Sequence, residues 1–129
     1  MKRIAASFSE ARQEYLRSGP ARCAVCWSPG AWPWYLTVHH ICGRGTKQHE
    51  TPANWLSICS ACHAAYHDGG THPLTLGHIL WAKQDADGYV DLEWLAMLRH
   101  KKHLGVEPEE LPEYYLGQRQ RNQKGYQLP

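Results

Sequence analysis

The stretch TVHHICGRGTKQHETPANWLSICSACHAAYH, residues 37–67, contains most of the residues that decide the fold. Residues 35–41 are rich in β-branched and aromatic side chains, which predicts a strand, and Gly43 ends it. Residues 55–58 alternate apolar and polar side chains, which predicts a second short strand that returns along the first. A short helix over residues 63–67 follows. The order strand, loop, strand, helix predicts a small α+β unit.

Further helices are predicted on both sides of this unit. Ser7 and Glu10 have the spacing of a capping box, which predicts a helix that ends near Ser18. Two more helices are predicted after the unit, over about 74–84 and 91–103, and the polar segment beyond about Leu116 is expected to be flexible. The expected organisation is an N-terminal helix over 1–20, a core over 21–70, a helical extension over 71–105 and a polar tail over 106–129.

Length and composition narrow the class of protein. The chain has 129 residues, which suits one compact domain, and its formal net charge is only +2. The apolar run near the N-terminus is too short for a signal peptide, and no stretch has the length of a membrane span. We therefore expect a cytoplasmic protein.

Four of the five cysteines form two C-x₂-C pairs. Cys23 and Cys26 form the first pair, and Cys59 and Cys62 form the second. Two such pairs separated by a long loop are typical of a tetrahedral zinc site, whereas the alternative is four buried thiols without a metal. A zinc ion held by four thiolates has no open coordination position, so we expect it to be structural. Cys42 stands apart and is interpreted as a small apolar side chain.

Four of the nine histidines fall close to these cysteines. His63 and His67 are four residues apart and therefore share one face of the predicted helix. His39 and His40 are neighbours on a strand, so their side chains point in opposite directions and can have different roles. Asn54 lies in the loop beyond this strand, nine positions before His63. The alternative is that some of these histidines are ordinary surface residues.

Taken together, these residues resemble the signature of the HNH endonuclease family, with its ββα-metal core. The resemblance rests on His39-His40-Ile41, Gly43-Arg44-Gly45, Asn54 and Cys59-Ser60-Ala61-Cys62-His63 followed by His67, and it spans roughly residues 23–67. Phage, restriction and homing HNH nucleases are most similar to it. The resemblance implies a small ββα-metal core with a structural zinc site, to which the flanking helices are additions.

The resemblance also implies a role for each residue. His39, His63 and His67 would bind the catalytic metal, where many members have Asp in place of the first. His40 would be the general base, and Asn54 would hold the loop that orients its ring. Arg44 would contact a phosphate.

The chemistry of phosphodiester hydrolysis fits these residue types independently. A neutral imidazole can accept a proton from water near pH 7, and a cation can stabilise the developing negative charge. Histidine ligands suit Zn²⁺, Ni²⁺ or Mn²⁺ better than Mg²⁺, although the family often works with Mg²⁺. The expected cofactors are thus a structural Zn²⁺ and one divalent catalytic metal.

The expected substrate is DNA, which we expect the protein to bind mainly through the phosphate backbone. Further candidate phosphate contacts are the basic residues of the C-terminal half: Arg99, Lys101, Lys102, Arg119 and Arg121. No recognition helix for reading bases is evident, so duplex DNA bound with weak sequence preference is expected. By analogy with compact HNH proteins, a bacterial or phage origin is expected.

Two other functions remain open from the sequence. A non-catalytic zinc-ribbon-like module that binds nucleic acid would explain the four cysteines but not the adjacent histidines. A nuclease that acts on structured or single-stranded nucleic acid, including RNA, would explain both the cysteines and the histidines.

Overall fold

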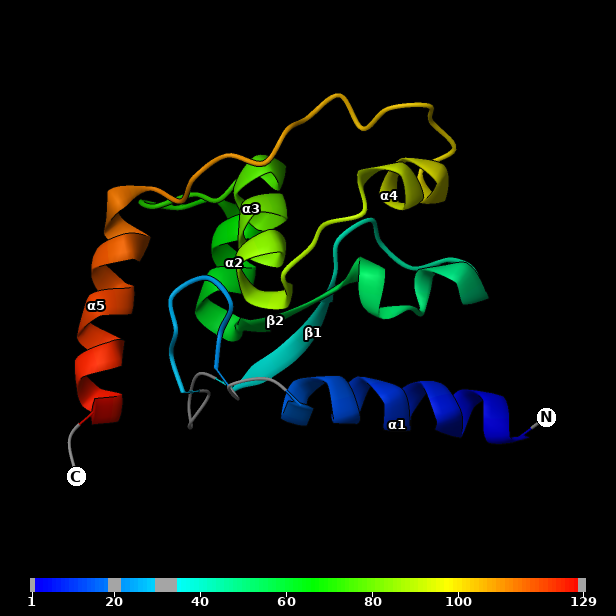
Figure 1. Ribbon diagram of the computed structural model, residues 1–129, viewed down its shortest axis with the longest axis horizontal. Coiled ribbons are helices and arrows are strands. Elements are labelled where there is room, and N and C mark those ends of the chain that lie inside the picture. The colour runs from blue at the N-terminus through cyan, green and yellow to red at the C-terminus, as the bar shows by residue number, and fades with distance from the viewer. Residues whose placement is uncertain (1, 19–21, 30–34, 128–129) are drawn as a thin grey trace.

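The computed structural model describes residues 2–18, 22–29 and 35–127. These residues form two strands, five α-helices and two short 3₁₀ helices (Figure 1). In chain order they are α1 (Lys2–Ser18), β1 (Leu36–His40), η1 (Lys47–His49), η2 (Pro52–Asn54), β2 (Trp55–Cys59), α2 (Ser60–Asp68), α3 (Leu76–Asp87), α4 (Leu92–Leu98) and α5 (Glu113–Gln127). No helix among the described residues is both long enough and apolar enough to cross a membrane.

The centre of the molecule is the ββα unit that the sequence predicts. β1 and β2 pair in antiparallel fashion, with His39 opposite Leu56 and His40 opposite Trp55. α2 begins directly after β2, because Cys59 has an extended backbone and its sulfur accepts a hydrogen bond from the amide of Cys62. The prediction of an α+β fold with a small ββα core and flanking helices is confirmed.

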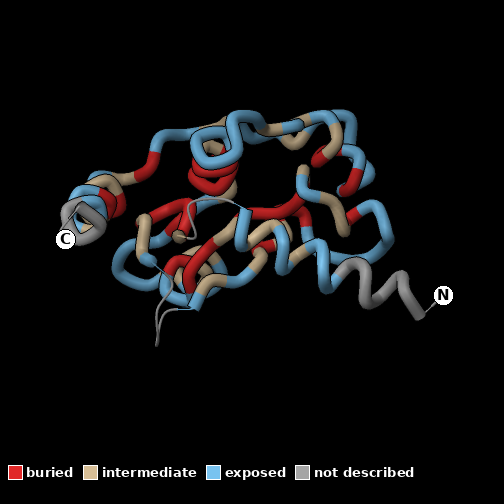
Figure 2. The backbone as a smooth tube through the Cα atoms, turned by 60° about the horizontal axis from the view of Figure 1, so that its bottom comes forward, coloured by how far each residue is buried: buried red, intermediate tan, exposed pale blue. Residues whose placement is uncertain are grey.

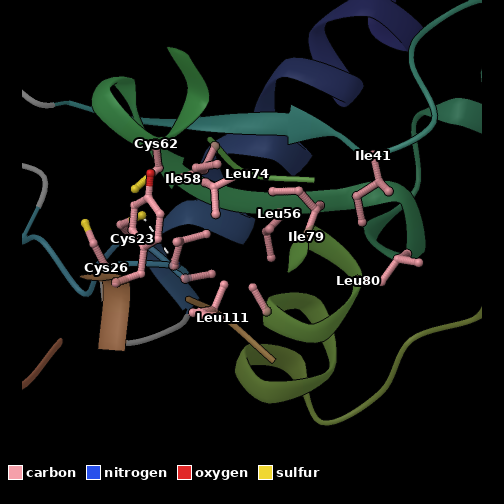
Figure 3. Packing of buried hydrophobic residues seen from close by; sticks show 14 of the residues in the cluster. Cys23, Cys26, Ile41, Leu56, Ile58, Cys62, Leu74, Ile79, Leu80 and Leu111 are labelled. Atoms are coloured by element: carbon pink, nitrogen blue, oxygen red, sulfur yellow. Dashed lines mark hydrogen bonds between the residues drawn. The ribbon is translucent and has the colours of Figure 1, made fainter. Parts of the chain in front are cut away.

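The hydrophobic core lies between the sheet and the helices of the C-terminal half. Leu56 and Ile58 from β2, Ile79 and Leu80 from α3, and Leu95 from α4 are completely buried. Burial of one such side chain stabilises the fold by roughly 1.5–3 kcal/mol. In Figure 3 the buried cysteines lie at one end of this core, so the metal-binding residues continue the apolar packing.

Helix α1 is attached to the ββα unit by polar contacts from its C-terminal half. The Tyr15 hydroxyl lies 3.0 Å from the Trp55 carbonyl oxygen and 2.8 Å from Asp87 Oδ2. Lys83, which is fully buried, donates to the Pro52 carbonyl at 2.6 Å and also contacts Asp87. Burial lowers the pKa of Lys83, while Asp87 acts in the opposite direction. This network holds α1, α3 and the start of η2 together, whereas the outer face of α1 is exposed (Figure 2).

The boundaries of two helices differ clearly from the prediction. α1 begins at Lys2 rather than near Ser7, and α4 ends at Leu98 rather than near His103. The backbone of His100 has a φ of 58°, a left-handed conformation that stops the helix.

The largest difference is in the C-terminal segment, which was expected to be flexible beyond Leu116. It forms α5, which lies at the opposite end of the molecule from α4 (Figure 1). Tyr115 and Arg119 of α5 and Leu111 just before the helix are buried at intervals of four residues, so one face packs on the protein. The polar composition hides this helix because it is stabilised by tertiary contacts rather than by a broad apolar face.

Candidate metal centres and nuclease site

The four paired cysteines meet at one point. Cys23 and Cys26 lie in the turn before β1, Cys59 ends β2 and Cys62 lies in the first turn of α2. Their sulfur atoms all lie within 4.8 Å of one another, and the Sγ atoms of Cys26 and Cys59 are 3.8 Å apart. All four residues are buried. The cysteines are therefore positioned to form a metal site, and their number and thiolate chemistry fit zinc.

Backbone amides favour the thiolate form that a metal needs at two of the four sulfurs. The amide of Val25 lies 3.4 Å from Cys23 Sγ, and the amide of Cys62 lies 3.5 Å from Cys59 Sγ. The neighbouring thiols hold the pKa of Cys59 well below its usual range through hydrogen bonds to its sulfur, whereas the same sharing raises the pKa values of Cys26 and Cys62, so without a cation the four sulfurs do not all become thiolates. Donors that surround a thiolate stabilise its charge, so the cluster is suited to a cation.

Helix α5 supports the first cysteine pair. Arg119 donates to the carbonyl oxygens of Val25 at 2.7 Å and Ala24 at 2.8 Å, and Asn122 donates to the Cys26 carbonyl at 2.8 Å. The Arg119 guanidinium also pairs with Asp85 at 2.9 Å, and the residue as a whole is 6% exposed. The prediction that Arg119 contacts DNA is therefore wrong, because its donors are already bound inside the protein.

A second cluster is formed by three histidines. His39 on β1 and His63 and His67 on α2 have ring nitrogens within 4.8 Å of one another. The Nε2 atoms of His63 and His67 are 3.0 Å apart, and the His39 ring lies 5.2 Å and 5.6 Å from theirs between centroids. Nε2 of His39 is buried and has no hydrogen-bond partner among the described residues. An unpaired buried nitrogen beside two further imidazoles fits a divalent metal ion.

The charge state of these rings also fits metal binding. Burial and the neighbouring His63 and His67 lower the pKa of His39 to about 3, so this ring is neutral near pH 7. Burial, followed by the charge of His67, also lowers the pKa of His63. Neutral imidazole is the form that binds a metal.

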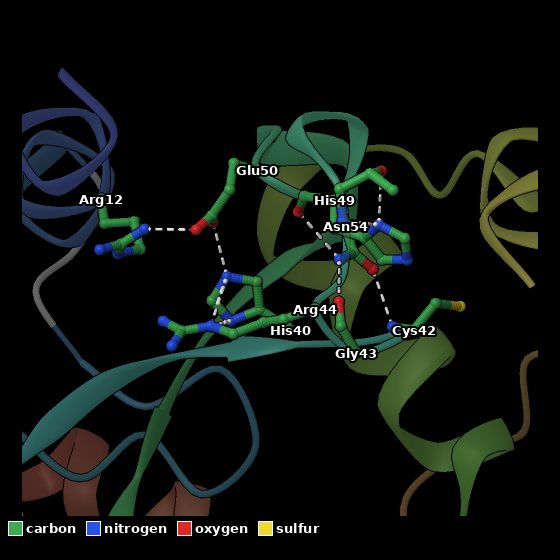
Figure 4. A network of polar contacts seen from close by, with 9 residues as sticks. Arg12, His40, Cys42, Gly43, Arg44, His49, Glu50 and Asn54 are labelled. Carbon is green, nitrogen blue, oxygen red and sulfur yellow. Dashed lines mark hydrogen bonds and ion pairs between the residues drawn. The ribbon is translucent and has the colours of Figure 1, made fainter. Parts of the chain in front are cut away.

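His40 points away from this cluster, as neighbours on a strand do. Its Nε2 lies 2.7 Å from Oε1 of Glu50, and Oε2 of Glu50 lies 2.6 Å from Arg12 NH1 (Figure 4). The side chain of His40 is 7% exposed. An ionised carboxylate can only accept, so Nε2 of His40 donates and Nδ1 is left without a proton.

Arg44 adds a cation on the other side of the His40 ring. Its Nε lies 3.4 Å from both ring nitrogens, so it lies beside the imidazole. Burial lowers the pKa of His40, the Glu50 hydrogen bond partly opposes this, and the positive charge of Arg44 lowers the pKa further. The result is a neutral ring beside an exposed arginine.

Asn54 holds together the two ends of the loop between the strands. Its Oδ1 accepts from the Cys42 amide at 2.7 Å, and its Nδ2 donates to the carbonyls of Gly43 at 3.1 Å and His49 at 3.0 Å. Asn54 is completely buried. It therefore positions Glu50, the residue after His49, through the backbone, and among the described residues its side chain makes no hydrogen bond to the histidine cluster.

The remaining candidate phosphate contacts lie on the surface. Arg44, Arg99, Lys101, Lys102 and Arg121 are exposed. Arg99 interacts with the buried Cys42 thiol, which brings the basic segment 99–102 next to the turn that contains Arg44. Among the described residues, Lys101 and Lys102 form no ion pair.

Two residues of the site were not identified from the sequence. Glu50 and Arg12 have no spacing relative to His40 that distinguishes them from other charged residues, because they meet it only through tertiary structure. The only signal in the sequence was a carboxylate in the loop that follows the strand-end histidines, and it is weak.

The comparison with protein families agrees with the geometry. Residues 23–69 match the HNH endonuclease family, a region that begins at the first cysteine of the tetrad and ends just after α2. The chain therefore contains an HNH endonuclease domain. No curated protein and no solved structure matched the chain. HNH nucleases act on nucleic acids, which makes a nuclease the class that this domain supports.

Proposed function

We propose that this protein is a metal-dependent endonuclease that hydrolyses phosphodiester bonds in DNA. The observation that carries the proposal is the pairing of two different histidine environments on one strand. His39 joins His63 and His67 in a cluster with an unpaired buried nitrogen, and the adjacent His40 has an unprotonated Nδ1 that Arg44 Nε contacts at 3.4 Å.

We assign the two clusters different metals. The cysteine tetrad would hold a structural Zn²⁺, and the histidine triad would hold a divalent ion such as Mg²⁺, Mn²⁺, Ni²⁺ or Zn²⁺. When bound, that ion supplies positive charge for the phosphate and the leaving oxygen.

The roles of the chain's own residues follow from their contacts. His40 Nδ1 accepts a proton from the attacking water, whose oxygen forms the new bond to phosphorus as the bond to the 3′ oxygen breaks. The family resemblance implies 5′-phosphate and 3′-hydroxyl products. Arg44 binds a phosphate oxygen near the ring, and Asn54 keeps the loop between the strands in place.

For the substrate, we propose the backbone of duplex DNA. Arg99, Lys101, Lys102 and Arg121 are exposed cations and would contact phosphates outside the reacting bond. By analogy with compact HNH proteins, we extend the proposal to a bacterial or phage-encoded protein that acts in the cytoplasm.

The decisive experiment is cleavage of supercoiled plasmid by the wild-type protein and by His40→Ala. Each protein is incubated with EDTA or with one of the four divalent ions, and His103→Ala serves as a control because His103 is an exposed histidine outside the site. We expect metal-dependent nicking by the wild type and by the control, and loss of nicking in His40→Ala. A wild-type protein that retains zinc and binds DNA but is inert with every ion would support the zinc-ribbon-like binding module instead.

The same assay identifies the preferred nucleic acid. Duplex DNA, branched DNA, single-stranded DNA and RNA are compared at equal nucleotide concentration. We expect duplex DNA to be cleaved fastest, and faster cleavage of another substrate would correct that part of the proposal.

A further inference from the structure

A continuous series of hydrogen bonds connects helix α1 to His40. Arg12 NH1 contacts Oε2 of Glu50 at 2.6 Å, and Oε1 of the same carboxylate contacts His40 Nε2 at 2.7 Å (Figure 4). The two partners use different oxygens, so both contacts are made at once. Arg12 lies outside the region that matches the HNH family, whereas Glu50 and His40 lie within it.

These contacts are sheltered from solvent. The side chains of Arg12, Glu50 and His40 are 24%, 17% and 7% exposed. An exposed ion pair is worth little because water competes with it, but charged hydrogen bonds at this level of burial hold a geometry more firmly. The exposed pair between Arg17 and Glu14 on the same helix, with side chains 66% and 70% exposed, provides an internal contrast.

The backbone around Glu50 is also held in place. The amide of Glu50 donates to the Lys47 carbonyl at 3.0 Å, and Asn54 binds the carbonyl of the preceding His49 at 3.0 Å. On the other side, Tyr15 attaches α1 to Trp55 on β2, one turn of helix from Arg12. Both ends of the series are therefore anchored to the same two-stranded sheet.

We propose that Glu50 is a positioning residue for His40, and that α1 completes the nuclease site by holding Glu50 through Arg12. The carboxylate selects the tautomer of His40 that has its proton on Nε2 and fixes the plane of the ring. Nδ1, which Arg44 Nε contacts at 3.4 Å, is then the unprotonated nitrogen that can accept a proton from the attacking water. A wrongly oriented or wrongly protonated imidazole cannot act as a base, as serine proteases show for the analogous carboxylate. The inference rests on the proposed role of His40 as the general base.

The test uses the full-length protein, supercoiled plasmid and the ion that gives the wild type its highest rate. Glu50→Gln keeps the size of the side chain, Glu50→Ala removes it, and Arg12→Gln leaves the carboxylate without its second partner. Arg17→Ala and Glu14→Gln are the matched controls on α1. We expect kcat to fall about 10²-fold or more in both Glu50 variants and about tenfold in Arg12→Gln, with KM changed less than about threefold. The controls should behave like the wild type.

Two further measurements distinguish positioning from a general effect on folding. Nitrogen NMR of the His40 ring at constant pH should show the proton on Nε2 in the wild type and a mixture of tautomers in Glu50→Ala. The Arg12→Gln/Glu50→Ala double variant should lose no more kcat than Glu50→Ala alone, because Arg12 acts through Glu50. Zinc content and thermal unfolding confirm that each variant is folded.

The outcomes separate this inference from the proposed function. Wild-type kcat in a folded Glu50→Gln or Glu50→Ala protein, while His40→Ala is inactive, would overturn the inference alone. Unchanged His40 tautomers in Glu50→Ala would also overturn it. A wild-type protein that cleaves with none of the ions, or a fully active His40→Ala protein, would overturn the proposed function and this inference with it.

Discussion

The two clusters of candidate metal-binding side chains differ in their exposure to solvent. In the cysteine tetrad all four residues are buried, and α5 covers the first pair through Arg119 and Asn122. In the histidine triad burial decreases from His39, which is buried, through His63 to the exposed His67. A closed tetrahedral set leaves no coordination position for a substrate, whereas three ligands at the surface leave one open. The burial of the cysteine tetrad therefore suits a structural metal site, whereas the partial exposure of the histidine triad suits a catalytic one.

The largest effect that this comparison predicts is loss of the fold when the tetrad is broken. In Cys59→Ser the structural zinc should be lost, because apparent zinc binding contributes roughly 10–16 kcal/mol to small zinc domains. Circular dichroism and metal analysis should show an unfolded, zinc-free chain. Cys42→Ser is the control, since Cys42 is a buried cysteine outside the tetrad, and it should remain folded with its zinc. A folded Cys59→Ser protein with unchanged thermal stability would contradict a structural role.

Removal of a histidine from the triad should lower the rate of cleavage strongly and change the stability little. His63→Ala should lower the rate of DNA cleavage by about 10³-fold, because the charge that a metal supplies to the transition state is worth several kcal/mol. Its melting temperature should change by only a few degrees, since His63 is half-buried and lies outside the hydrophobic core. The rate of plasmid nicking and a thermal melt give both values. Loss of the structural zinc in this variant would show that the two clusters are not independent.

Arg119 on helix α5 should stabilise the loop of the first cysteine pair and should not contribute to DNA binding. In Arg119→Ala the carbonyls of Ala24 and Val25 lose their donors, and we expect the free energy of unfolding in urea to fall by about 2–4 kcal/mol. The control is Arg121→Ala, an exposed arginine two residues further along the same helix. It should unfold like the wild type and bind DNA more weakly, with the salt dependence reduced by about one charge. Equal stability of the two variants would argue against this stabilising role of Arg119.

The smallest effect concerns the outermost ligand. His67→Ala should weaken binding of Mn²⁺ or Ni²⁺ by about tenfold, because His67 is exposed and the two other imidazoles remain. Isothermal titration of the zinc-loaded protein measures this affinity, with His103→Ala as the control. If His67→Ala binds these ions as tightly as the wild type does, the open cluster has two histidine ligands rather than three.

Much of the core of the fold was predictable from the sequence. The alternation in residues 55–58 and the helical spacing of His63 and His67 are local patterns, and they correspond to β2 and α2. The two C-x₂-C pairs likewise predicted that residues far apart in the chain would meet. In each case the periodicity of the backbone or the geometry of a metal site limits the possible arrangements.

The environment of His40 and the helix α5 were not predictable in the same way. No local sequence pattern relates Arg12 or Glu50 to His40. Arg119 lies in a polar, basic segment that is typical of a protein surface, although the residue is buried. The helix was missed because its packed face is narrow and includes an arginine.

The sequence by itself determined which residues can bind metals, since ligand type and spacing are local and chemical properties. Only the tertiary structure decided which cluster is closed and which carboxylate meets His40, and that Arg119 supports a cysteine pair instead of contacting DNA. The physical reason is that burial and long-range hydrogen bonds depend on how separate elements pack. That packing arises from many weak contacts over the whole chain, and no short pattern encodes it.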